Sequence, residues 1–131
     1  NIGEVHDPNA YIIQDFCSHA GLFGTLEGVC RTMIHWNQQC DFITQVSQRL
    51  TNHQSRFCLG WDKVEDIYHT IAGSHCGRKT FGHLGFTGTS FWVDPDQLRG
   101  HVILTNATKY HWFDKKKLNF IRREVGKIVW S

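Results

Sequence analysis

A glycine-rich stretch over residues 81–95 is the part of the sequence best suited to chemistry. Gly82, Gly85 and Gly88 alternate there with His83 and small hydroxyl residues, and the stretch leads into an apolar run. Glycine allows a ligand to approach the backbone closely and leaves amide N–H groups to face an anion. A glycine-rich β-bulge without any ligand would show the same pattern. The stretch is therefore a candidate ligand site that needs support from the rest of the chain.

Nine histidines and five cysteines raise the question of a metal site or a thiol nucleophile. The histidines include no H-E-x-x-H pair, and the cysteines are too widely spaced for a zinc ribbon. Cys17 with His19, and Cys76 with His75, are close in sequence, but so short a spacing commonly arises by chance. A reactive thiol also needs a hydrogen-bonded base, and adjacent residues on a strand point to opposite faces. We expect no metal, no other cofactor and five free thiols, with two disulfides and one free thiol as the alternative.

The composition predicts one globular domain with little net charge. The chain has 131 residues, of which 40% are apolar, and this is enough material for a core. Fourteen Lys and Arg against twelve Asp and Glu leave a net charge of +2, too weak a field to favour nucleic acid or an anionic membrane as partner. No apolar run approaches the ~20 residues of a membrane-spanning helix.

Helices are predicted in the first half and at the end of the chain. Residues 1–24 carry turn formers without a sustained period, so we expect a loop there. Thr25 is placed to cap a helix whose apolar residues share one face that is expected to be buried, and a second helix is predicted at about 41–50. Asp114 opens a final helix, and its basic residues, Arg122 included, are expected on a solvated outer face.

Short aromatic and β-branched runs predict four strands, at 56–61, 67–72, 89–93 and 101–105. The D-P-D-Q turn at 94–97 joins the last two strands as a hairpin. Helices first, antiparallel strands next and one helix last predict an α+β fold, with the C-terminal helix packed on the sheet.

Five short motifs run along the chain in a fixed order. They are V-H-D-P-N-A (5–10), S-H-A-G-L-F-G-T (18–25), F-C-L-G-W (57–61), H-L-G (83–85) and V-I-L-T-N (102–106). Together they resemble the serine β-lactamase and penicillin-binding protein superfamily, in its class C β-lactamase and esterase branch. In that branch a His-x-Gly or Lys-Thr-Gly triplet lies on the strand that borders the active site. The resemblance implies a β-lactamase-like hydrolase domain, of which residues 1–131 form the C-terminal part.

The chemistry that this resemblance implies is acyl transfer, in which a serine attacks a carbonyl carbon and backbone N–H groups stabilise the oxyanion. His83 takes the place of the triplet's cationic residue. Gly85 takes the place where a side chain would block the substrate, and the N–H of Phe86 is the one that would face the oxyanion. Leu84 stands where many relatives have a hydroxyl residue for a substrate carboxylate, so no preference for an acid is implied. The first two motifs add candidates for lining the pocket: His6, Asp7, Asn9 and His19.

The family's S-x-x-K and Y-x-N elements do not occur in this sequence. No serine is followed by x-x-K, and no tyrosine, Tyr110 included, begins Y-x-N or Y-x-S. Both elements precede the matched motifs in the family, and the chain starts with Asn1 rather than Met. The expectation is therefore the C-terminal part of a longer hydrolase for an ester, an amide or a β-lactam, with no catalytic nucleophile in this chain. A non-catalytic binding module derived from the same fold is the alternative.

Partners and compartment follow from the same considerations. The complete enzyme would take a small acyl substrate. A chain cut from such a fold exposes sheet edges and apolar patches, which predicts a homodimer or association with the missing N-terminal part. Members of the family often act in the periplasm, whereas free thiols favour the cytoplasm.

Overall fold

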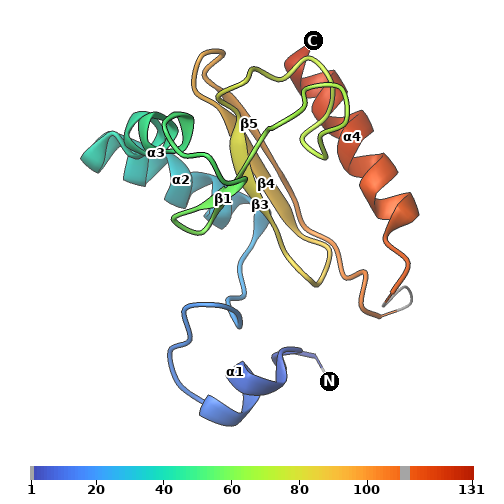
Figure 1. The fold of residues 1–131 in the computed structure, drawn as a ribbon. Helices are drawn as coiled ribbons and strands as arrows, with labels where there is room; N and C mark the ends of the chain where they lie inside the picture. The colour runs from blue at the N-terminus through green and yellow to red at the C-terminus, as the bar shows by residue number, and fades with distance from the viewer. Residues whose placement is uncertain (1, 110–112) are drawn as a thin grey trace.

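An antiparallel sheet of five strands, paired in chain order, lies at the centre of the fold (Figure 1). The computed structural model describes residues 2–109 and 113–131, so Tyr110 and His111 lie outside the described residues. The strands are β1 (Phe57–Cys58), β2 (Trp61–Lys63), β3 (Phe81–Leu84), β4 (Ser90–Asp94) and β5 (Arg99–Ile103). With helices before and after this sheet, the predicted α+β fold is confirmed.

Helices lie on both sides of the sheet (Figure 1). α2 (Leu26–Cys40) and α3 (Phe42–Thr51) lie on one side, and α4 (Lys116–Trp130) lies on the other. Side chains alternate along β4, because successive residues of a strand point to opposite faces. Val93 packs with the buried residues of α3, whereas Trp92 packs with Trp130 of α4. The sheet therefore separates two apolar clusters.

The C-terminal helix packs closely against the loop that precedes β3. A Cβ atom at Gly126 would lie 1.8 Å from the carbonyl oxygen of Ala72. The indole Nε1 of Trp130 donates a hydrogen bond to the same oxygen at 2.7 Å. Arg122, expected on the outer face, is only 3% exposed, and its Nη2 donates to the carbonyl of Thr89 at 2.6 Å. The prediction was wrong because positions 122, 126 and 130 share one helix face, and the small residue at 126 brings that face inward.

The N-terminal segment contains a short helix where a loop was predicted. α1 spans Pro8–Ile13, and the Asp7 side chain accepts hydrogen bonds from two backbone N–H groups of its first turn. Proline at the first helical position and aspartate at the N-cap are start signals for a helix. The prediction interpreted D-P-N as a turn and missed this signal. In Figure 1, α1 lies apart from the sheet and its covering helices.

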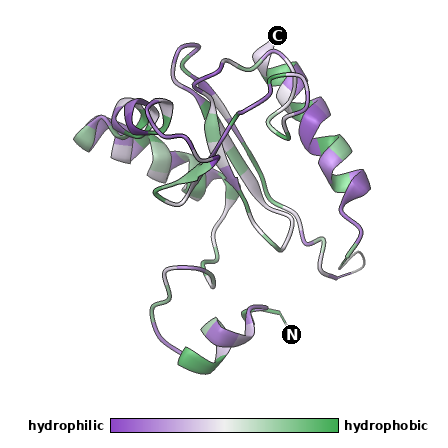
Figure 2. Ribbon diagram, in the orientation of Figure 1, coloured by the Kyte–Doolittle hydropathy of each residue, from purple (hydrophilic) through white to green (hydrophobic). Residues whose placement is uncertain are grey.

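Helix α2 begins as predicted, but its apolar face is not buried. The Thr25 side chain caps it by accepting from the backbone N–H of Gly28 at 3.0 Å. None of its residues is buried, and Leu26 and Ile34 are more than half exposed. Figure 2 shows hydrophobic and hydrophilic residues alternating along both α2 and α4. The pattern therefore predicted the helix correctly and its burial incorrectly.

Two of the four predicted strands differ from the structure. The run at 56–61 is two short strands, since Leu59 and Gly60 both have positive φ and form a tight turn between them. The run at 67–72 forms turns, in which the Asp66 carboxylate accepts from the N–H of Tyr68 and pairs with His69. Such local side-chain bonds compete with strand pairing. The β4–β5 hairpin is confirmed, with β5 starting two residues earlier than predicted.

No helix among the described residues is long and apolar enough to span a membrane. All five cysteines are free thiols.

Candidate functional site

The hairpin of β3 and β4 positions the residues of the H-L-G motif. β3 ends at Leu84, and Gly85 and Phe86 belong to the connection that follows. The N–H of Gly85 donates to Thr89 at 2.9 Å, and the N–H of Gly88 donates to Gly85 at 3.0 Å. The first two motif residues therefore lie on a strand, whereas Phe86 lies in a turn.

The edge of β3 that faces away from β4 is only partly paired. β4 pairs with all four residues of β3, whereas β2 pairs only with Phe81 and Gly82. The N–H of Gly85 points toward β4. Because the backbone N–H and C=O groups of successive strand residues point to alternate edges, those of Leu84 point away from β4, beyond the end of β2. His83 at this edge is exposed, and Leu84 is half-buried. Within the described residues, no strand is paired with this edge at His83 and Leu84, so an extended peptide can be added there.

Two of the motif residues have structural roles that need no ligand. The side chain of Leu84 packs against the apolar cluster that contains Trp92 and Trp130. A Cβ atom at Gly85 would lie 2.0 Å from the Thr89 hydroxyl oxygen. A side chain at 85 would thus displace the Thr89 hydroxyl, whatever binds beside the hairpin.

The turn at Phe86 brings together parts of the chain that are far apart in sequence. The ring centroids of His6 and Phe86 lie 5.5 Å apart. Lys115, just before α4, donates from Nζ to the carbonyl oxygen of Phe86 at 3.1 Å, and the same Nζ lies 5.3 Å from the ring centroid. Sequence reasoning counted Lys115 among the solvated cations of the last helix and missed this contact. The structure thus places one predicted pocket residue, His6, beside Phe86, directly after the H-L-G motif, together with the ammonium group of Lys115.

The other N-terminal candidates form a second cluster around Asp7. Its Oδ1 accepts from the backbone N–H groups of Asn9 and Ala10 at 3.0 and 2.9 Å, and lies 3.1 Å from Nε2 of His19. The hydrogen bond from Ala10, followed by the one from His19, lowers the pKa of the Asp7 carboxyl below its ordinary value. Nδ1 of the same imidazole lies 3.0 Å from Sγ of Cys17. Asn9 contributes its backbone alone to these bonds.

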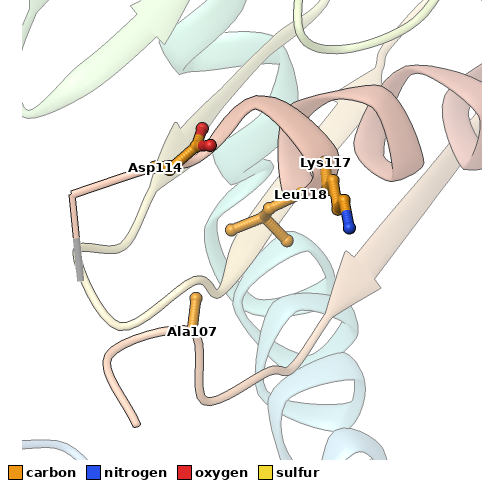
Figure 3. Close-up of a pocket in the computed structure, with 4 residues that line it drawn as sticks. All are labelled: Ala107, Asp114, Lys117 and Leu118. Atoms are coloured by element: carbon orange, nitrogen blue, oxygen red, sulfur yellow. The ribbon is translucent and has the colours of Figure 1, made fainter. Parts of the chain in front are cut away.

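A small pocket lies beside the Phe86 turn, between the segment after β5 and the start of α4 (Figure 3). It has a volume of about 210 Å³ and is lined by Ala107, Asp114, Lys117 and Leu118. The N–H of Ala107 donates to the carbonyl of Thr87 at 2.7 Å, which ties the pocket to the β3–β4 connection. None of the residues predicted to line a pocket is among these four.

Across the described residues, no group of three or more His, Cys, Asp or Glu side chains is placed to hold a metal ion.

Known proteins similar to this chain are enzymes by name. N-acetylmuramyl-L-alanine amidase of Bacillus subtilis (strain 168) is 31% identical over 119 residues. Two proteins named as D-alanyl-D-alanine carboxypeptidases, from Escherichia coli O157:H7 and Escherichia coli (strain K12), are each 30% identical over 115 residues. Each alignment covers 79% of this chain and 26% of the relative, so the chain spans about a quarter of the length of the curated relatives it matches. No protein-family model and no solved structure matches the chain.

Proposed function

We propose that this chain is the C-terminal part of a serine hydrolase that cleaves an ester or amide bond in a peptidoglycan-related substrate. The observation that carries the proposal is the free edge of β3 at His83 and Leu84. The names of the similar proteins, an amidase and carboxypeptidases that act at alanine, supply the substrate class. The five motifs that resemble the β-lactamase and penicillin-binding protein superfamily supply the reaction class.

In this proposal the substrate lies extended along the free edge. Main-chain hydrogen bonds to Leu84 would hold it in register, as they do when a peptide adds a strand to a sheet. The exposed imidazole of His83 would contact the substrate beside that strand, and the N–H of Phe86 would face the oxyanion. Lys115, through its hydrogen bond to the Phe86 carbonyl, would hold the turn in place.

The attacking serine would come from a part of the protein that precedes these residues. The exposed apolar face of α2 fits such a partner, because Leu26, Ile34 and Trp36 are each between 48% and 58% exposed. Exposed apolar patches of this kind mark sites of association. In the isolated chain we expect the same face to form a homodimer, which light scattering would detect.

The test joins this chain to the sequence encoded directly before it. We expect that sequence to contain S-x-x-K and Y-x-N, and the complete protein to hydrolyse a nitrophenyl ester and a peptide ending in D-alanyl-D-alanine. This chain alone should turn over neither substrate. As a control, replacing the serine of S-x-x-K by alanine should abolish the turnover of both.

The alternative is a non-catalytic binding module. The β3 edge favours this alternative over other non-catalytic roles, because a peptide can be added there as a strand without any nucleophile. A complete protein without S-x-x-K that still binds the peptide would support this alternative and contradict the hydrolase.

A further inference from the structure

Three reactive side chains are joined by hydrogen bonds away from β3, at the two ends of α1. Sγ of Cys17 lies 3.0 Å from Nδ1 of His19, and Nε2 of the same ring lies 3.1 Å from Oδ1 of Asp7. Asp7 is the N-cap of α1, and Cys17 and His19 lie in the bend after that helix. The chain does not form a strand there, so the expectation that neighbouring side chains diverge does not apply.

These hydrogen bonds determine which of the two imidazole nitrogens of His19 carries the hydrogen. An ionised carboxylate only accepts hydrogen bonds, so Nε2 of His19 carries the hydrogen that is donated to Asp7. Nδ1 then carries the lone pair. Sγ of Cys17 lies 3.0 Å from Nδ1 and 3.9 Å from Nε2, so the thiol lies over the ring on the Nδ1 side, and a side-chain rotation would bring it in line with the lone pair. Two backbone N–H groups hold Asp7 in position from the other side. A thiol, a base and a group that orients the base are the parts of an activated nucleophile.

The three groups are accessible, and two other thiols in the described part of the chain, Cys40 and Cys76, have different surroundings. The side chains of His19 and Asp7 are 49% and 33% exposed, and Cys17 is half-buried. Cys40 is exposed, but its Sγ donates to a backbone carbonyl of its own helix, that of Trp36. Cys76 is buried, and this burial raises the pKa of its thiol to about 11. The chain therefore contains its own controls for thiol reactivity.

We propose that Cys17 is a nucleophile that accepts an acyl group from an activated ester or thioester. The thiol proton passes to Nδ1 of His19, and the sulfur attacks the carbonyl carbon. The bond from that carbon to the leaving oxygen or sulfur then breaks, and the leaving group takes the proton from the imidazolium. The products are S-acyl Cys17 and a free alcohol or thiol. His19 acts as the base, and Asp7 is a positioning residue.

The experiment uses the full chain with nitrophenyl acetate and locates the acetyl group by peptide mass spectrometry. We expect release of one nitrophenolate per chain in a first phase, with Cys17 acylated at least tenfold faster than Cys40, because general-base catalysis contributes ~10²–10⁴-fold. All five thiols compete in one sample, so this comparison needs no variant that must fold. Equal rates at Cys17 and Cys40 would overturn the proposal.

Three variants separate the roles. His19→Asn should slow acylation of Cys17 to the rate of Cys40. Asp7→Asn keeps an N-cap side chain for α1 but removes the carboxylate that orients the His19 ring. We expect the acylation rate of Cys17 to fall about tenfold, while the helical circular dichroism signal stays like that of the parent chain. His69→Asn disrupts a second histidine–aspartate pair, that of His69 with Asp66, and should leave the acylation rate of Cys17 unchanged. A Cys17 rate that is the same in His19→Asn as in the parent chain would also overturn the proposal.

Discussion

Helices α2 and α4 have 15 residues each, and both are amphipathic, yet the fold buries them to different extents (Figure 2). α4 buries three residues, Arg122, Gly126 and Trp130, whereas α2 buries none. The difference in burial depends on which part of the protein each helix contacts. α4 contacts two loops: its indole donates to the carbonyl of Ala72 in the loop before β3, and its guanidinium donates to that of Thr89 in the β3–β4 connection. An amphipathic pattern therefore predicts that a helix has a partner surface, but not whether that surface belongs to the same chain.

The largest expected effect contrasts two tryptophans, one on each helix. Trp130 is 5% exposed and donates to the Ala72 carbonyl, so Trp130→Ala leaves a cavity and a buried acceptor without its donor. We expect a loss of about 4 kcal/mol in the free energy of unfolding. Trp36 is 48% exposed, and we expect Trp36→Ala to cost about 1 kcal/mol or less. Urea denaturation of both variants measures the difference, and equal losses would contradict the contrast between the helices.

A smaller effect is expected from pH on the α4 side of the sheet. His101 is 8% exposed, and its ring centroid lies 5.3 Å from that of Trp130. Burial lowers the pKa of His101 below its ordinary value of 6.5, because the interior disfavours the charged ring. The unfolded chain then binds more protons than the folded chain as the pH falls below about 6.5, so the free energy of unfolding decreases.

His101→Gln removes this titration, and the free energy of unfolding between pH 7 and pH 5 should fall less steeply than in the parent chain. His35→Gln, at an exposed position of α2, is the matched control and should keep the parent's slope. Identical slopes for His101→Gln and the parent would show that burial of His101 does not contribute to the pH dependence of the free energy of unfolding.

The elements with the strongest local signals were predictable from the sequence. Thr25 caps a helix as its residue type and position indicate, and the proline turn after β4 joins two strands. Two of the errors arose where a side chain bonds its own local backbone, as Asp7 does at a helix start and Asp66 does in a turn. A third has a different cause: Arg122 is buried because a glycine four residues away brings its helix face inward.

The candidate site was predictable in part. The resemblance selected the H-L-G motif and His6 as candidates, and in the structure the motif begins at the end of β3 and the ring of His6 lies beside that of Phe86. The contact of Lys115 with Phe86 depends on how α4 packs, and the hydrogen bonds between Cys17, His19 and Asp7 depend on a bend. The spacing of Cys17 and His19 pointed to that pair, but residue spacing gives no signal for its bond to Asp7 or for the Lys115 contact, because both depend on tertiary structure.

The measurement that tests the β3 edge most directly is kcat/KM of the complete protein for a peptide ending in D-alanyl-D-alanine. Leu84→Pro removes the N–H that points away from β4, whereas Leu84→Ala removes the side chain and keeps that N–H. We expect Leu84→Pro to lower kcat/KM at least tenfold relative to Leu84→Ala, since a hydrogen bond contributes ~0.5–1.5 kcal/mol and a displaced substrate loses more. Equal values for the two variants, both folded by circular dichroism, would contradict substrate binding along this edge.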